Sequence, residues 1–176
     1  MVDAITTTTN LAQRNIALMA VVMEGTENFF FSQLLKLGKC GVVTKFTPEE
    51  RKIVAALRKK VKPERQQCFA NSQKAGYQGF YEAVHYVEGY IVRRNCPVEV
   101  HHGWLTLNGK VVDLTLPSDE CDYFGIEIPW PTVTQFLVDY ESHGPMLADM
   151  ELGYKYAATI LDPDGQLRAA LAGEPT

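Results

Sequence analysis

Apolar positions in the first third of the chain recur with the period of an α-helix. Residues 11–24 are apolar almost all round and predict a buried helix, which Asn10 is placed to cap. Residues 29–37 repeat the helical pattern, and a glycine follows them as a stop. The clearest helix start is Thr47, where a threonine, a proline and a glutamate form a capping box. We expect that helix to end before Pro63.

The pattern then changes from helical to strand-like. Residues 68–78 keep modest helical character, whereas residues 83–93 are rich in Val, Ile and Tyr and predict a strand. Residues 98–107 and 110–116 flank an Asn-Gly pair, the strongest short-range indication of a β-hairpin. A further short strand is predicted over residues 124–128.

The last part of the chain returns to helices. An acidic loop at 118–122 leads to the last strand, and helices are predicted over 132–142 and 146–161. Helices followed by strands predict an α+β fold with an antiparallel sheet, not a parallel wound sheet. We expect a single domain, residues 1–176. Its parts are a helical N-terminal part over 1–63, a catalytic-type core over 64–128 and C-terminal helices over 129–176.

Composition and charge narrow the function classes. The chain is 46% hydrophobic and 22% charged, as in ordinary globular proteins. Seventeen Lys and Arg against 21 Asp and Glu give a net charge of −4. A duplex-binding protein usually carries a basic stripe that displaces counterions from phosphate, and the sequence has none. The basic face of the helix before Pro63 is interpreted as a solvated surface. We therefore expect no nucleic-acid partner.

Apolar runs and cysteine spacing bear on the compartment. The longest purely apolar run, residues 16–23, has eight residues, and it begins too late for a signal peptide. A bilayer-spanning helix needs ~20 residues. The four cysteines lie far apart without a C-x-x-C pair, so neither a disulfide framework nor a zinc site is expected. We expect an acidic, cytoplasmic protein with reduced thiols, no cofactor, no metal and no membrane partner.

The predicted hairpin brings a histidine and a carboxylate together. With Asn-Gly as the two turn residues, His102 opposes Thr115. Trp104 then opposes Asp113. Because side chains alternate between the faces of a strand, these four share one face, and Asp113 lies diagonally within reach of His102. His101 points to the opposite face, so the two histidines cannot readily bind one metal ion.

Cys68 is the candidate nucleophile for this histidine. A carboxylate fixes the tautomer of an imidazole and stabilises its charged form, as a general base beside a nucleophile requires. Cys68 lies at the predicted start of a helix, where backbone N–H groups and the helix dipole lower the pKa of a thiol. A thiol, an imidazole and a carboxylate would then form a triad for acyl transfer.

The segments that hold these residues resemble the core of the transglutaminase-like superfamily, within the papain-like cysteine enzymes. Members show a Gln-Cys-aromatic segment, a His-x-aromatic strand and an Asp-x-Thr strand, in that order. Residues 67–69, 102–104 and 113–115 match this pattern, and the resemblance covers about residues 64–116. Phe69 stands where members commonly have Trp, and a leucine follows Asp113 where they often have Pro.

The resemblance implies that Cys68 is the nucleophile, that His102 is the base and that Asp113 orients the base. It implies a cysteine-dependent amidohydrolase, either a peptidase or a protein or peptide deamidase, whose substrates are peptide or protein amides. The superfamily also contains acyl transferases and inactive members. The main alternative is therefore a non-catalytic binding or inhibitor protein with the same fold. Such a protein would have a protein partner and would be of phage or plasmid type.

Four further side chains are candidates for oxyanion or substrate binding. Gln67 is the amide donor nearest to the candidate nucleophile. Trp104 would form one wall of a cleft, and Asn71, one turn into the helix, either lines the cleft or solvates the helix. Glu88 lies in the middle of an apolar strand, where a carboxylate needs a partner or an exposed face. It either faces the same cleft as the histidine or is paired within the structure.

Overall fold

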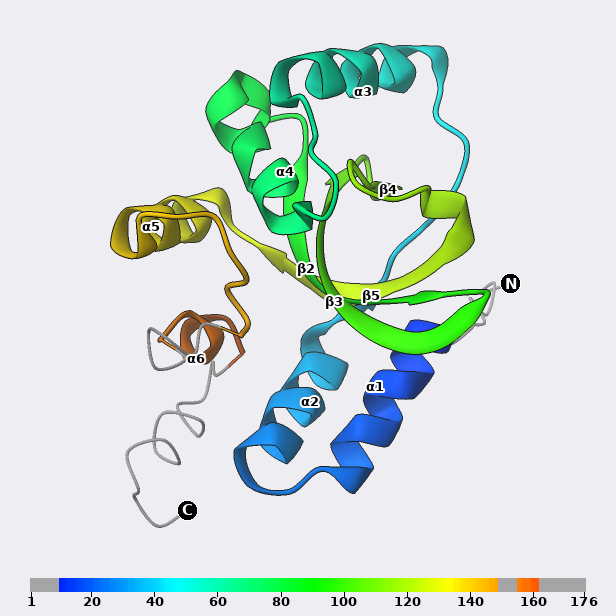
Figure 1. Cartoon of the computed structure of the whole chain (residues 1–176), viewed down its shortest axis with the longest axis vertical. Coiled ribbons are helices and arrows are strands. Elements are labelled where there is room, and N and C mark those ends of the chain that lie inside the picture. Colours follow the sequence, from blue (N-terminus) through cyan, green and yellow to red (C-terminus); the bar gives the residue numbers. More distant parts are fainter. Residues whose placement is uncertain (1–9, 149–154, 162–176) are drawn as a thin grey trace, which may run out of the picture.

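The fold is α+β, with a curled sheet of five strands in the order β1-β5-β2-β3-β4 (Figure 1). The structure is a computed structural model that describes residues 10–148 and 155–161. All the ladders between these strands are antiparallel. The strands, in chain order, are β1 (Lys39–Cys40), β2 (His85–Arg93), β3 (Cys96–Leu107), β4 (Lys110–Val112) and β5 (Cys121–Ile128).

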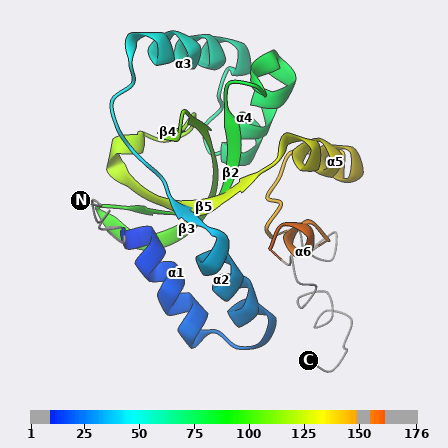
Figure 2. The same cartoon turned by 180° about the vertical axis from the view of Figure 1, so that it is seen from behind.

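The helices lie outside the curl of the sheet. Their bounds are α1 (Leu11–Val22), α2 (Gly25–Leu37), α3 (Pro48–Val61), α4 (Cys68–Ala75), α5 (Trp130–Tyr140) and α6 (Lys155–Leu161). Two short turns complete the described elements: η1 (Gly76–Phe80), a π-helical turn, and η2 (Ser118–Glu120), a 3₁₀ turn. In both views α1 and α2 lie on one side of the sheet and α3 and α4 on the other (Figures 1 and 2). Among the described helices, none is long and apolar enough to cross a membrane.

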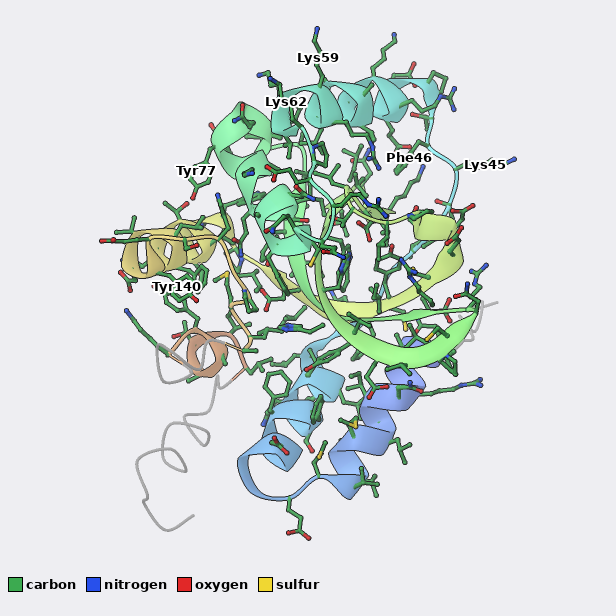
Figure 3. The ribbon with its side chains drawn as sticks, viewed as in Figure 1. Lys45, Phe46, Lys59, Lys62, Tyr77 and Tyr140 are labelled. Atoms are coloured by element: carbon green, nitrogen blue, oxygen red, sulfur yellow. The ribbon has the colours of Figure 1, made fainter. Side chains whose placement is uncertain are left out.

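The predicted helix caps are present. The Asn10 side chain accepts the backbone N–H three residues on at 2.9 Å and so begins α1. Thr47 and Glu50 form both halves of the capping box that begins α3. The basic face of α3 is exposed as predicted at Lys59, which points away from the sheet (Figure 3), whereas Arg58 of the same face reaches other parts of the chain.

Two predicted helices differ from the structure. α1 is not buried all round: Ile16 faces the core, but Leu18 is 61% exposed and Val21 79% exposed. A helix at the periphery meets the sheet with one side only, so an apolar sequence does not by itself bury it. The helix predicted over 146–161 is found as a turn at 146–148 and as α6, and residues 149–154 lie outside the described residues.

The β3–β4 hairpin has the predicted register over a shorter length. The ladder ends at the pair Leu105–Val112, so the expected pairing of Thr115 with His102 is not formed. Beyond this pair the carboxylate of Asp113 accepts the backbone N–H groups two and three residues on, at 2.7 and 2.9 Å. Such side-chain acceptors compete with a ladder and turn the chain. β4 therefore leaves β3 before it reaches the histidine.

A short segment closes the curl. β1 pairs with β5, and Val42, just beyond β1, forms a bridge with Lys110 of β4. This segment thereby links the two edges of the sheet. No sequence pattern predicts β1, because two residues are too few for an alternation to appear.

The two faces of the sheet build different cores. The outer face packs against the helices in two apolar clusters. The inner face packs on itself, and its cluster contains Val87, Ile91, Trp104, Val111, Cys121 and Tyr123. Because side chains alternate along β3, His102 points inward with Trp104, whereas His101 points outward.

Candidate active site

α4 begins at an edge of β3 that no strand covers in the described part of the chain. β4 has left this edge at Val112, and α4 satisfies the polar groups that it exposes. The carbonyl of Gly103 accepts the hydroxyl of Ser72 at 3.0 Å, and the backbone N–H of Gly103 bonds the sulfur of Cys68. These two contacts hold α4 against the strand and set Cys68 beside His102.

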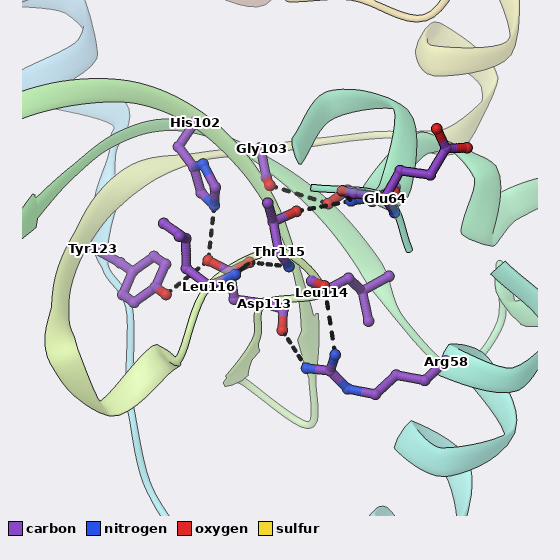
Figure 4. A network of polar contacts seen from close by, with 11 residues as sticks. Arg58, Glu64, His102, Gly103, Asp113, Leu114, Thr115, Leu116 and Tyr123 are labelled. Carbon is purple, nitrogen blue, oxygen red and sulfur yellow. Dashed lines mark hydrogen bonds and ion pairs between the residues drawn. The ribbon is translucent and has the colours of Figure 1, made fainter. Parts of the chain in front are cut away.

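His102 lies between the thiol and the carboxylate that the sequence predicted for it. Its Nε2 is 2.7 Å from Oδ2 of Asp113 (Figure 4). Its ring also hydrogen-bonds the thiol of Cys68. Since the carboxylate occupies Nε2, Nδ1 is the nitrogen left to face the sulfur. His102 and Asp113 are each 3% exposed, and Cys68 is half-buried. The thiol is therefore the accessible end of the triad.

The carboxylate of Asp113 receives four hydrogen bonds. Oδ2 accepts from His102 and, at 2.9 Å, from the hydroxyl of Tyr123. Oδ1 accepts the backbone N–H groups of Thr115 at 2.7 Å and Leu116 at 2.9 Å (Figure 4). The same side chain thus holds the imidazole and turns the chain after β4.

Arg58 fixes the backbone of this turn from α3. Its Nη2 donates to the carbonyl of Asp113 at 2.7 Å, and its Nη1 to the carbonyl of Leu114 at 3.4 Å (Figure 4). One residue of the basic α3 face therefore supports the site. The sequence did not single it out, because its partners are backbone atoms more than fifty positions away.

The charges of the triad stabilise one another. Burial alone would raise the pKa of Cys68, but the hydrogen bond and charge of His102 and two backbone N–H groups outweigh it and lower that pKa. Burial would lower the pKa of His102, but Asp113 and Cys68 raise it to about 9. Burial would likewise raise the pKa of Asp113, which its imidazole partner lowers. The shifts favour a thiolate beside an imidazolium that a carboxylate holds.

Trp104 and Tyr123 lie behind the imidazole. The Trp104 ring is nearly parallel to that of His102, at 6.4 Å and 18°, and meets the Tyr123 ring edge-on at 5.2 Å. Trp104 is 1% exposed, so it supports His102 from the inner core and does not form the cleft wall that we predicted. The strand predicted over residues 124–128 begins after Tyr123, so no sequence pattern places this residue in the site.

Asn71 is buried and supports the site from within. Its amide accepts the N–H of Glu64 at 2.9 Å and donates to the carbonyl of the same residue at 2.7 Å. It also donates to the hydroxyl of Thr115 at 3.0 Å. It therefore neither lines a cleft nor solvates the helix, but ties the loop before Cys68 to the turn after Asp113.

Glu88 lies on the sheet face opposite the triad and is paired there. It accepts the hydroxyl of Tyr86 at 2.8 Å and the backbone N–H groups of Met146 and Leu147 at 3.0 and 2.8 Å. Nε2 of His101 lies 3.0 Å from Oε1 of Glu88. Of the two alternatives for this carboxylate, the structure therefore places it in the paired one, because residue 88 faces outward on β2.

Gln67, the remaining predicted substrate-side residue, is exposed at the start of α4. Within the described residues no group of three or more His, Cys, Asp or Glu side chains could hold a metal ion. Comparisons with protein-family models, curated proteins and solved structures give no match. The geometry of the triad is therefore what bears on function.

Proposed function

We propose that this protein is a cysteine-dependent amidohydrolase with a papain-like, transglutaminase-like core, acting as a peptidase or as a protein or peptide deamidase. One observation carries the proposal: His102 lies 2.7 Å from Asp113 and also hydrogen-bonds Cys68 at the start of α4. A structural cysteine needs no oriented imidazole and no lowered pKa, whereas a nucleophile needs both. The order of the three segments agrees with the resemblance over about residues 64–116.

The proposed reaction begins at Cys68. Its thiolate attacks the carbonyl carbon of the amide, forming a carbon–sulfur bond and moving negative charge onto the carbonyl oxygen. The backbone N–H of Cys68 and the exposed amide of Gln67 are the proposed donors to that oxygen. As the carbon–nitrogen bond breaks, the imidazolium of His102 gives its proton to the departing amine, or to ammonia when the substrate is a side-chain amide.

Water completes the cycle. It attacks the thioester while the neutral His102 takes one of its protons, and the carbon–sulfur bond breaks. The acid product leaves, and the thiolate and imidazolium are restored. Asp113 keeps its charge throughout and holds the imidazole in one orientation. An amine that took the place of water would give acyl transfer by the same steps.

The first test is the pH dependence of iodoacetamide labelling, with peptide mapping to separate the four cysteines. We expect Cys68 to react at pH values well below about 8.5, the ordinary pKa of a thiol. In His102→Ala this reaction at low pH should be lost. A Cys68 that reacts no faster than Cys96, the exposed cysteine, would contradict the proposal. Peptides containing glutamine and asparagine then serve as substrates, with mass spectrometry to distinguish deamidation from cleavage. Cys68→Ala should abolish the product, and Cys96→Ala should not.

A second candidate function is a binding protein on the same fold. It is favoured by three exposed apolar side chains of α1, Leu18, Val21 and Val22. Apolar side chains that gather on a surface often mark a protein interface. In that case Val21→Glu would weaken partner capture, whereas Cys68→Ser would leave capture unchanged and Cys68 would label like an ordinary thiol.

A further inference from the structure

One hydroxyl of the inner core touches the triad without taking part in the acyl transfer proposed above. The Tyr123 hydroxyl donates to Oδ2 of Asp113 at 2.9 Å, and the same oxygen meets Nε2 of His102 at 2.7 Å. Tyr123 is fully buried, with Trp104 against its ring. The imidazole and the phenol thus share a single acceptor atom.

Asp113 is held in place by other contacts as well. Its Oδ1 accepts two backbone N–H groups, and its carbonyl accepts the Arg58 guanidinium at 2.7 Å. Loss of the Tyr123 hydroxyl would therefore leave the carboxylate oriented. It would change how much negative charge Oδ2 presents to the imidazole, because a donor on an oxygen draws charge from it.

We propose that Tyr123 is a positioning residue that shares Oδ2 of Asp113 with His102 and thereby limits how tightly the carboxylate holds the imidazolium proton. This inference rests on the proposed function. An imidazolium that is held less tightly gives its proton more readily to a departing amine. Tyr123 thus acts on the proton-transfer step through Asp113, without contact with the substrate.

The titratable groups near His102 come from three parts of the chain. They are Cys68 on α4, Asp113 in the turn after β4, and Tyr123 with Cys121 on β5. Burial and the charge of Asp113 raise the pKa of Tyr123 and of Cys121. Both groups therefore stay protonated around neutral pH, and the phenol remains a donor. The charge that responds to Tyr123 is that of His102.

The test is an NMR titration of the imidazole nitrogens, with His102 assigned by its absence from the His102→Gln spectrum. Tyr123→Phe removes the hydroxyl and keeps the ring. We expect the pKa of His102 to rise above its value of about 9, a change of about threefold or more in the proton-binding constant. 3-Fluorotyrosine at position 123 is a stronger donor and should shift this pKa in the opposite direction. It carries the test if Tyr123→Phe does not fold.

Tyr86→Phe is the matched control, because the Tyr86 hydroxyl donates to Glu88 at 2.8 Å on the other face of the sheet. It should leave the His102 titration unchanged. If the pKa of His102 is unchanged or lowered in folded Tyr123→Phe, or rises equally in Tyr86→Phe, the proposed role of Tyr123 is wrong. The proposed function of the protein is not affected by either result. If wild-type His102 titrates near its ordinary value of about 6.5, the proposed function fails and the role of Tyr123 fails with it.

Discussion

Two buried carboxylates on opposite faces of the sheet have closely similar surroundings. On the inner face, Asp113 lies against His102 and accepts one tyrosine hydroxyl and two backbone N–H groups. On the outer face, Glu88 lies against His101 and also accepts one tyrosine hydroxyl and two backbone N–H groups. The two histidines are consecutive residues of β3, so alternation along one strand supplies both sites.

α4 extends the parallel with two amide side chains. Asn71 binds both the N–H and the carbonyl of Glu64 and reaches the turn beside the inner carboxylate. Gln73 binds both the N–H and the carbonyl of Gly144, at 3.3 and 2.6 Å, and donates to Tyr86 at 3.2 Å. Each amide therefore connects one carboxylate network to a separate segment of the chain.

The two networks differ in two respects. Nε2 of His102 is hydrogen-bonded to its carboxylate, whereas Nε2 of His101 lies 3.0 Å from Glu88 without hydrogen-bond geometry. The far sides of the two rings also have different neighbours. His102 meets the Cys68 thiol. The ring of His101 lies against Tyr90, at 5.1 Å and 27°, and against Phe69, at 5.2 Å and 61°. A histidine and a carboxylate in contact are therefore present in both networks. The thiol at the start of a helix is what makes one of these pairs a candidate for catalysis.

The largest expected effect separates the two histidines. Near about pH 6 an ordinary thiol is less than about 1% ionised, so loss of the imidazole in His102→Gln should slow iodoacetamide labelling of Cys68 by more than about tenfold. His101→Gln should change this rate by no more than about twofold, because that ring meets no thiol. Peptide-mapped labelling measures both. Equal losses in the two variants would mean that the networks are not functionally different.

The charge of His102 should also appear in the pH dependence of stability. A pKa raised to about 9 from an unfolded value of about 6.5 stabilises the fold fully below the lower value, and this stabilisation is lost as the pH rises through about 9. We expect the unfolding free energies of wild type and His102→Gln to converge by about 2 kcal/mol between neutral pH and about pH 10. Urea unfolding at both pH values measures this, and a constant difference would contradict the raised pKa.

Substitution of the two carboxylates should have different effects, one on the reactivity of Cys68 and the other on the stability of the fold. Asp113→Asn should slow the labelling of Cys68 by about tenfold, since a neutral amide stabilises the imidazolium less. Glu88→Gln should keep the labelling rate but lower the free energy of unfolding by about 1–2 kcal/mol, because buried N–H groups lose a charged acceptor. Labelling and urea unfolding of both variants check this. A slowed thiol in folded Glu88→Gln would show that the two networks are coupled.

The smallest expected effect concerns the two amides of α4. Asn71→Ala and Gln73→Ala should each lower the free energy of unfolding by about 1–2 kcal/mol, because each leaves buried backbone groups unpaired. Only Asn71→Ala should also slow the labelling of Cys68, by about threefold, since its side chain joins the loop before Cys68 to the turn after Asp113. A comparable slowing in Gln73→Ala would remove this distinction.

The parts that the sequence predicted are those set by local interactions. Asn10 and Thr47 cap helices within a turn of themselves, and an Asn-Gly pair fixes the hairpin register within a few residues. The same locality brought His102 and Asp113 together on one hairpin. Cys68 joined them through its place at a helix start, which the sequence pattern also indicates.

The parts that the sequence did not predict depend on pairing between distant segments. β5 lies between β1 and β2, and only this placement brings Tyr123 to the carboxylate of Asp113. The outward direction of Glu88 follows from the ladders on both sides of β2. The burial of Trp104 follows from the closing of the curl. No spacing along the chain encodes these long-range contacts.

Consecutive histidines with matching partners have a consequence for how β3 finds its place during folding. A slip of one residue would exchange the two faces, offering His101 to Asp113 and His102 to Glu88. The histidines therefore discriminate poorly between the two alignments. Gly103 discriminates strongly, since even a Cβ there would lie 2.9 Å from the Phe69 ring and 3.1 Å from the Tyr86 hydroxyl. A slipped strand would put a large side chain under α4 and keep the helix from docking. The smallest residue of the strand thus selects which histidine receives the thiol.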